Sequence, residues 1–341
     1  MKILSQDKKG YQVILEVEED YEKLEPQIEE AYSEAARDVN IPGFRPGKVP
    51  SSVLKQYLNE EAVIDRAIQL LVAEIYPEML DSAKIKPVDY PNVEVKQMKK
   101  DSPIIFVIKV DVHPDVKISN YKGIKVKKKE TAVKDSEVDE TLEVVRKNFA
   151  KQGNIPESEL PIDDEFAKKV SRSNTLEELK ALIRSNIEEE KKRDSDQSIR
   201  DDVTRNLAEI VEAEVPKGMV EREIELMLSD LEVSLKRSRM TLSSYLSAIK
   251  KDIDKVKEEM KASALTRVKA KLALEAIAEK EKLDVDEGEL DKEIEALAQH
   301  SGKAFEEYKA GLSADVLGSI KDYMLKEKAI DFVVSKAKVE G

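Results

Sequence analysis

The side chains that usually carry out catalysis or bind metal ions are scarce in this sequence. There is no cysteine, and the two histidines, His113 and His300, stand far apart in the chain. Disulfide bonds and thiolate chemistry are therefore excluded, and the common zinc sites built from cysteine and histidine nearly so. Two histidines that are far apart in the sequence also give little basis for acid-base catalysis by histidine. We expect His113, beside Pro114, and His300, at the end of a helix, to have structural or solvent-exposed roles.

The charged residues are abundant but form no evident catalytic set. Residues 188–190 are three glutamates, a run typical of an exposed helix face, with a cation site as the weaker alternative. Residues 127–129 are three lysines, which could contact phosphate but are more often simply solvated. The sequence has no Walker A pattern, no G-x-S-x-G motif and no Rossmann glycine set. We therefore predict no catalytic residue, no bound metal and no cofactor.

The most concentrated signal lies in one loop. Residues 40–50 include three prolines and two glycines, which favours neither helix nor strand. No acidic residue occurs between Val39 and Leu58, although about one residue in five of the chain is acidic. Phe44 and Arg45 lie between the two glycines, where an arginine could bind phosphate and an aromatic ring could fill an apolar pocket of another macromolecule. The alternative is that Phe44 folds back onto the neighbouring helices and Arg45 is only solvated.

Composition limits the classes of protein that remain. The 341 residues carry 71 acidic and 58 basic side chains, a net charge of -13, which argues against a protein that coats nucleic acid by bulk charge. A local basic site could still dock on RNA. Charged residues make up 38% and aromatic residues only 5%, a composition that favours helices with large polar surfaces and modest cores. No stretch is apolar enough to span a membrane, and the first residues do not resemble a secretory signal, so we predict a cytoplasmic protein.

The spacing of apolar residues predicts a small α+β domain over residues 1–113. Residues 11–18 alternate between apolar and polar, as in a strand with one covered face. A helix should follow, with Asp20 as its N-cap. A short helix ending at Leu58 and a longer amphipathic helix over residues 60–82 come after the loop. Two further strands are predicted, over residues 93–97 and 104–112.

The rest of the chain is predicted to be a lysine-rich extended linker, residues 114–134, and an elongated all-α domain with helical arms, residues 135–341. Thr175, followed three residues later by Glu178, is a typical start of a helix. Another helix should begin at Pro216. Residues 188–198 contain no apolar side chain, so we expect the helix there to be surrounded by solvent. The chain as a whole is thus predicted to be mostly helical.

The loop also carries a resemblance to a known family. Residues 43–50 match the pattern G-F-R-x-G-x-x-P, which resembles the signature loop of trigger factor, the bacterial ribosome-associated chaperone. The order of elements around the loop, and the helices from Ile162 onward, are similar to that family too. Some members have lysine where this chain has Pro46. The resemblance implies that the ribosome-binding residues are Gly43, Phe44, Arg45, Pro46, Gly47 and Lys48.

The same resemblance implies the function and the partners. The family is an ATP-independent chaperone that docks on protein and rRNA at the exit tunnel of the large ribosomal subunit and shields nascent or unfolded polypeptides. No membrane partner is implied, and a homodimer off the ribosome is left open. Met227, Met240 and Met260 are candidates for contacting clients because methionine adapts to varied shapes, although core packing is the preferred interpretation of each.

One part of the family's usual organisation is missing. Members usually carry a prolyl-isomerase domain of the FK506-binding type, but here only residues 150–159 separate Phe149 from Leu160. We therefore expect a chaperone that is not an enzyme. Two other functions stay open: a client-binding chaperone with no role at the ribosome, and a helical scaffold protein.

Overall fold

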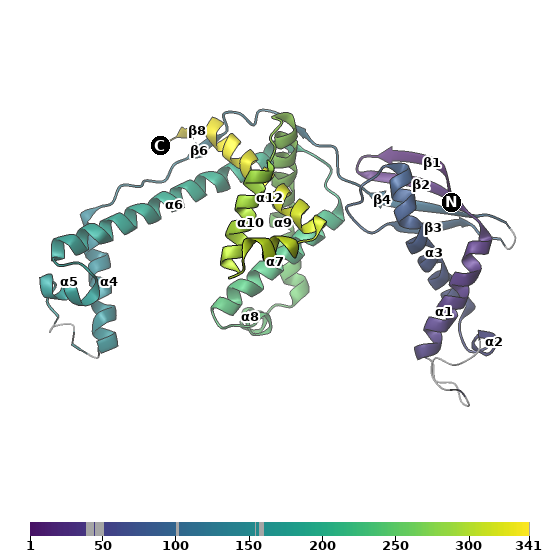
Figure 1. Ribbon diagram of the computed structural model, residues 1–341, viewed down its shortest axis with the longest axis horizontal. Coiled ribbons are helices and arrows are strands. Elements are labelled where there is room, and N and C mark those ends of the chain that lie inside the picture. The colour runs from purple at the N-terminus through teal and green to yellow at the C-terminus, as the bar shows by residue number, and fades with distance from the viewer. Residues whose placement is uncertain (39–43, 45–50, 100–101, 154, 157–159, 341) are drawn as a thin grey trace. The chain divides into compact units, whose positions relative to one another are not determined.

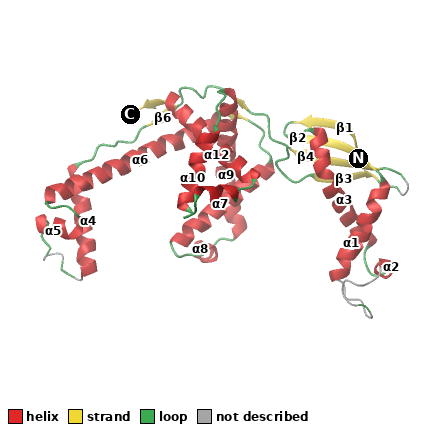
Figure 2. Ribbon diagram, viewed as in Figure 1, coloured by secondary structure: helices red, strands yellow, loops and turns green. Residues whose placement is uncertain are grey.

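The computed structural model describes the whole chain except residues 39–43, 45–50, 100–101, 154, 157–159 and 341. An α+β region with a four-stranded antiparallel sheet is followed by a largely helical region, which confirms the expected fold class (Figure 1, Figure 2). The chain divides into two compact units, residues 1–116 with 212–268 and residues 117–211 with 269–341. No helix in the described part of the chain is long and apolar enough to cross a membrane.

The sheet of the N-terminal region has the strand order β1-β2-β4-β3, with every neighbouring pair antiparallel. Its strands are β1 (Lys2–Lys9), β2 (Gln12–Glu19), β3 (Asn92–Gln97) and β4 (Ile104–Asp111). In β2 the alternate residues Val13, Leu15 and Val17 are buried, which confirms the predicted covered face. Strand β1 was not predicted from the sequence. Nearly all its side chains are exposed, so no alternation marks it, and it is held by backbone pairing with β2.

Helices cover one face of this sheet. They are η1 (Tyr21–Lys23), α1 (Leu24–Asp38), α2 (Ser51–Leu54) and α3 (Glu60–Ala83). Asp20 occupies the N-cap position before η1, but its side chain makes no cap hydrogen bond, so its predicted role is only partly correct. The side chain of Asn59 does accept a hydrogen bond from the backbone N–H of Glu61 and caps α3.

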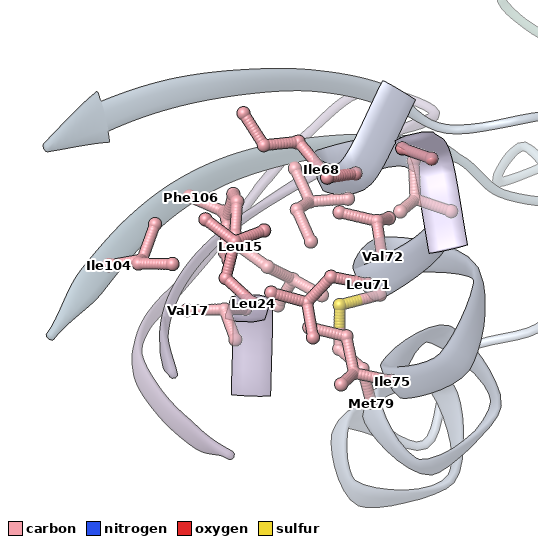
Figure 3. Close-up of a cluster of buried hydrophobic side chains, with 14 of the residues drawn as sticks. Leu15, Val17, Leu24, Ile68, Leu71, Val72, Ile75, Met79, Ile104 and Phe106 are labelled. Atoms are coloured by element: carbon pink, nitrogen blue, oxygen red, sulfur yellow. The ribbon is translucent and has the colours of Figure 1, made fainter. Parts of the chain in front are cut away.

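A continuous apolar core lies between the sheet and the helices (Figure 3). It is built by apolar side chains from the inner strands, from the start of α1 and from one side of α3. Those labelled in the figure are Leu15, Val17, Leu24, Ile68, Leu71, Val72, Ile75, Met79, Ile104 and Phe106. Burial of large apolar side chains contributes about 1.5–3 kcal/mol each, so this core fixes the elements on which the loop is mounted.

The second segment of the first unit, residues 212–268, contains two long helices joined by a short one. They are α7 (Lys217–Arg237), α8 (Leu242–Ile249) and α9 (Ile253–Lys280), and α9 continues into the other unit at Lys269. Pro216 lies at the N-cap of α7, as predicted. The buried residues Ile224, Leu228, Val256 and Ala264 form the small core between α7 and α9.

The other unit contains the remaining elements, except that the boundary between the units falls within β7, after Val211. They are β5 (Lys117–Ile118), β6 (Lys125–Lys127), α4 (Asp135–Gly153), α5 (Asp164–Val170), α6 (Leu176–Ile210), β7 (Val211–Glu212), α10 (Glu287–His300), α11 (Phe305–Ala310), α12 (Ala314–Lys336) and β8 (Lys338–Glu340). Thr175 caps α6, as predicted, by accepting a hydrogen bond from the N–H of Glu178. The short strands β6 and β8 pair in parallel, which ties the extended segment to the end of the chain.

The polar middle of α6 is not surrounded by solvent, contrary to the prediction from the sequence. Ser195 is fully buried, and its Oγ lies 3.4 Å from the carbonyl oxygen of Lys129. The Nζ of Lys191 donates to the carbonyl oxygen of Ala132 at 2.7 Å and to Oε2 of Glu137 at 2.8 Å. The extended segment before α4 therefore packs along this stretch. Apolar periodicity could not reveal the contact, because the groups that make it are polar.

Candidate functional site

The loop identified in the sequence begins and ends on helices that are fixed in the N-terminal core. Tyr32 and Ala36 of α1 are buried, and Leu54 of α2 is only 1% exposed. The Nζ of Lys55 lies 5.8 Å from the centroid of the Tyr32 ring, within range of a cation–π interaction. Burial, with a smaller effect from the Glu60 carboxylate, raises the pKa of Tyr32 and keeps its hydroxyl neutral. Both ends of the loop are thus anchored by packed side chains.

Phe44 is the member of the predicted ribosome-binding set that the structure describes. Its side chain is 40% exposed and lies in a bend. It does not belong to the cluster of described residues that makes the N-terminal core. An exposed ring agrees with the predicted contact to a partner, which stays a prediction, as does the alternative in which Phe44 folds back onto the helices. The other members, Gly43, Arg45, Pro46, Gly47 and Lys48, lie outside the described residues.

The helices beside the loop are polarised in charge. Arg37 lies in the last turn of α1 and Lys55 follows α2, and both side chains are exposed. Further back on α1, the Glu34 carboxylate accepts a hydrogen bond of 2.8 Å from Nε of Arg66 on α3. This hydrogen bond lowers the pKa of Glu34, so its charge is compensated locally. The sequence between Val39 and Leu58 contains no acidic residue that could compensate the cations there in the same way.

A second kind of surface is found on the helices, several of which leave large apolar side chains exposed. On α7, Leu226 is 51% and Val233 is 46% exposed. They are seven residues apart and so lie on one face of the helix, two turns from each other. Their neighbours Ile224 and Leu228 point into the core with α9. Other exposed apolar side chains are Val144 on α4, Leu182 on α6, Leu265 on α9, and Val316 and Tyr323 on α12.

The three methionines proposed from the sequence divide into two groups. Met227 and Met260 are partly buried against the α7–α9 core, in agreement with core packing as the preferred interpretation. Met240, between α7 and α8, is 40% exposed. Sequence reasoning missed Leu226 and Val233. The available signal was that Leu226 falls outside the row of apolar residues spaced by three and four that marks the buried side of α7.

The titratable residues gather into no evident catalytic centre. In the described residues, no group of three or more histidine, aspartate or glutamate side chains is placed to hold a metal ion. The Nδ1 of His300 lies 2.9 Å from the carbonyl oxygen of Ala296 in the last turn of α10. The Nδ1 of His113 lies 3.3 Å from the carbonyl oxygen of Pro114. Both histidines have local structural contacts, in keeping with the roles expected for them.

Comparison with protein families gives two matches that follow one another along the chain. Residues 1–145 match the family model described as "Bacterial trigger factor protein (TF)", and residues 175–335 match the one described as "Bacterial trigger factor protein (TF) C-terminus". Together they leave unmatched only residues 146–174 and the last six residues. No prolyl-isomerase domain was found between them.

Curated relatives are similar over almost their entire length. The trigger factor of Caldanaerobacter subterraneus subsp. tengcongensis is 29% identical over 406 aligned positions, covering 93% of this chain and 94% of the relative. That of Bacillus cereus is 28% identical over 413 positions, covering 95% and 97%. These alignments are longer than the 341 residues of this chain, so the relatives contain segments that it lacks.

A solved structure shares the fold. It is reported as "Promiscuous Substrate Recognition in Folding and Assembly Activities of the Trigger Factor Chaperone" and superposes with a TM-score of 0.53 at 20% identity. The superposition covers 98% of this chain and all of the other. From the two family matches and the shared fold, we conclude that the chain belongs to the trigger factor family and is a trigger-factor-like chaperone.

Proposed function

We propose that this protein is an ATP-independent chaperone of the cytoplasm that docks on the large ribosomal subunit at the exit tunnel. The loop at residues 43–48 would contact ribosomal protein and rRNA, and the helices would shield nascent or unfolded polypeptides. The observation that carries the proposal is the exposure of Phe44. An apolar ring held 40% exposed, in a stretch without acidic residues and between two anchored helices, is well suited to enter a pocket on a partner.

The electrostatics of the loop agree with a negatively charged partner. Arg45 and Lys48 in the loop, with Arg37 in the last turn of α1 and Lys55 just after α2, make a small basic region in a chain of net charge -13. A guanidinium can bind phosphate oxygens in a bidentate manner, which suits rRNA. With so few cations involved, the affinity should fall only modestly as salt is raised.

The exposed apolar residues of the helices support the chaperone half of the proposal. Leu226 and Val233 on α7, with Met240 nearby in sequence, offer separated apolar contacts instead of one deep pocket. A contiguous exposed apolar patch commonly marks an interaction site, and single exposed apolar residues do not, so the support comes from Leu226 and Val233 sharing one face of α7. Scattered contacts of this kind suit clients that differ in sequence, because no single side chain sets the specificity.

The functional division of the chain follows from this proposal. Residues 1–113 would bind the ribosome, residues 114–134 would link, and residues 135–341 would act on clients. Because no isomerase domain is found, the protein would not be an enzyme and would not accelerate prolyl isomerisation, whose barrier is roughly 18–20 kcal/mol. A refolding assay limited by proline isomerisation checks this point, and measurable acceleration would refute it.

Ribosome docking is tested with the double variant Phe44→Ala, Arg45→Ala. We expect co-sedimentation with isolated large subunits to weaken by at least about tenfold, because two central contacts of a small interface are lost. A matched control is Lys86→Ala with Tyr90→Ala, which also removes an exposed cation and an exposed aromatic ring from the same region. The control should bind like the parent. Equal binding by the loop variant and the parent would remove the ribosome from the proposal.

The two rival functions are separated by a second measurement on the same proteins. A chaperone without a ribosomal role would delay aggregation of an unfolded client but would not co-sediment with ribosomes. A helical scaffold would do neither. We expect the loop variant to lose ribosome binding and to keep its effect on aggregation, since the exposed apolar residues of the helices are untouched.

A further inference from the structure

The N-terminal sheet leaves one side of its core uncovered along strand β3. This strand is at the edge of the sheet and pairs on one side with β4. Val93 and Val95 are opposite Ile108 and Phe106 of β4, so they lie on the face that carries the core. Ile108 and Phe106 are completely buried, whereas Val95 is 39% exposed. The helices therefore cover the central strands but not the edge strand.

A groove of about 750 Å³ lies between α3 and β3. Ile68 and Val72 of α3 form one wall, and Val93 and Val95 form the other. The lining residues of α3 run from Asp65 to Tyr76, which are eleven residue steps, or about 16 Å, apart along the helix axis. An extended polypeptide rises about 3.3 Å per residue, so the groove has the length of about five residues.

The polar groups that a ligand could reach lie along the outer edge of β3. The backbone of an edge strand has N–H and C=O groups on its outer side, where the structure describes no neighbouring strand. The hydroxyl of Tyr76, whose ring also lines the groove, is shielded from solvent, so a ligand in the groove does not reach it. Burial, with a smaller effect from the Asp89 carboxylate, raises the pKa of this hydroxyl.

Charge adds a preference for one kind of occupant. Asp65 is the charged residue among those that line the groove, its side chain is exposed, and it forms no ion pair within the described part of the chain. A lysine or arginine on the ligand would complement it. A second copy of this chain is a poorer occupant, because each copy carries a net charge of -13.

We propose that this groove binds an extended, basic segment of a client polypeptide, which adds as a strand to the free edge of β3. Alternate apolar side chains of the segment enter the groove between α3 and β3, while its backbone pairs with β3. A basic side chain of the segment lies at Asp65, which is exposed at the groove. The inference rests on the proposed chaperone function and adds to it a defined client site outside the exposed apolar residues of the helices.

The probe for this site is a fluorescein-labelled ten-residue peptide in which valine alternates with serine and one terminal residue is lysine. Fluorescence anisotropy with the full chain should detect saturable binding. Methylation of the alternate backbone nitrogens that would pair with β3 should weaken binding at least about tenfold, because strand addition depends on those donors. Glutamate in place of the lysine should weaken it severalfold. Equal binding of the parent and methylated peptides would rule out strand addition.

Side-chain variants tie the binding to this groove. Tyr76→Phe removes a shielded donor that has no described partner, so the folded protein should be as stable as the parent or more stable. The same change should leave the peptide affinity unchanged, because the ligand does not reach that hydroxyl. Ala73→Gln places a longer neutral side chain at an exposed lining position and should weaken binding severalfold, whereas Ala62→Gln, at an exposed position of α3 outside the groove, should not.

The result separates this inference from the proposed function. If Ala73→Gln binds the peptide like Ala62→Gln, the groove is not the site, and the inference fails even if the protein still delays aggregation and binds ribosomes. If Ala73→Gln alters self-association in sedimentation and not peptide affinity, the groove is an interface between copies, and the inference also fails. If the peptide variants behave as expected while the loop variant still binds ribosomes, the docking loop fails and the groove stands.

Discussion

The N-terminal region and the arm formed by α4, α5 and α6 are stabilised in different ways. The N-terminal region has one continuous apolar core with buried residues from β2, β4, α1, α2 and α3, and side chains of β1, β3 and η1 pack against it. The arm has a smaller apolar cluster, around Phe166, Leu179 and Ile183. Further along α6, the contacts are polar and involve Ser195 and Lys191. Apolar burial is thus interrupted in the middle of α6 and resumes at Ile199, Val203 and Leu207.

This difference shows how the polar middle of a long helix can be positioned between two apolar contacts. The middle of this 35-residue helix has a single extended segment as its partner, so it buries little apolar surface there. Carbonyl groups of that segment instead accept hydrogen bonds from α6. Such contacts are individually weak, because folding exchanges hydrogen bonds to water for hydrogen bonds within the protein. The arm should therefore have a lower free energy of unfolding than the N-terminal region. Its hydrogen bonds still determine which residues of the extended segment lie beside which residues of α6.

The largest expected effect on stability comes from replacing one buried phenylalanine by alanine in each region. Phe106→Ala should destabilise the N-terminal region by about 3–5 kcal/mol, through lost burial and the cavity left behind. Phe166→Ala should act on the arm, where the ring packs edge-on against Phe149 at 6.2 Å between centroids. Hydrogen exchange followed by mass spectrometry reports each region separately. Phe106→Ala should speed exchange in β2, β4 and α3 but not in α6, and Phe166→Ala should do the reverse; shared acceleration would mean that the regions unfold as one.

The sequence predicted most of the fold because apolar burial leaves a periodic trace. The alternation at Val13, Leu15 and Val17 placed β2 and its buried face, and spacings of three and four placed most of the long helices. Strand β1 shows no apolar periodicity in the sequence, because it is held in the sheet by backbone pairing. The burial of Ser195 could not be predicted either, since a serine in a polar run gives no sign of whether it is buried or exposed. For the candidate site, the loop was evident from its glycines, prolines and missing acids, whereas Leu226 and the β3 groove depend on which surfaces the tertiary fold leaves uncovered.

Glu19 is a charged residue buried beside the apolar N-terminal core. Replacing it is expected to have the next largest effect on stability. It is 2% exposed on the covered face of β2. Its carboxylate accepts hydrogen bonds from the N–H of Asp20 at 3.0 Å and from Nζ of Lys23 at 3.2 Å. We expect Glu19→Gln to cost about 2–3 kcal/mol at pH 7 in urea unfolding, because a buried charged pair loses one member. Glu18→Gln, on the opposite face of the strand, should be close to neutral.

The dependence on pH sharpens this test. Burial alone would raise the pKa of Glu19, but its hydrogen bonds to Asp20 and Lys23 and the nearby amino terminus together bring it below the ordinary value of 4.5. A carboxyl whose pKa is lower in the folded state stabilises the protein above the unfolded value and ceases to do so as the pH falls through the folded value. The difference between parent and Glu19→Gln should therefore shrink below about pH 4.5. A constant difference down to pH 2 would contradict the assignment.

A smaller effect tests whether the middle of α6 is packed. Ser195→Leu forces a larger side chain into a buried position against the extended segment and should cost about 1–2 kcal/mol. Ser185→Leu makes the same change at an exposed position of the same helix and should stay within about 0.5 kcal/mol. Thermal unfolding of the two variants provides the comparison. Identical behaviour would restore the view that α6 is surrounded by solvent there.

The smallest effect expected is that of the ion pair beside Ser195. Lys191 donates to the carbonyl of Ala132 and to the carboxylate of Glu137, and its hydrogen bond holds the pKa of Glu137 below the usual value. Because this pair is partly exposed, Lys191→Met should lower the melting temperature of the arm by only about 1–3 °C at low salt. Lys192→Met, an exposed neighbour, should change it less. At about 1 M salt, where the screening length is about 3 Å, the difference between the two variants should narrow but not vanish, because the bond to the Ala132 carbonyl does not depend on the carboxylate. Complete loss of the difference at high salt would mean that the ion pair alone positions Lys191, and that the extended segment is held against α6 by fewer contacts than the structure shows.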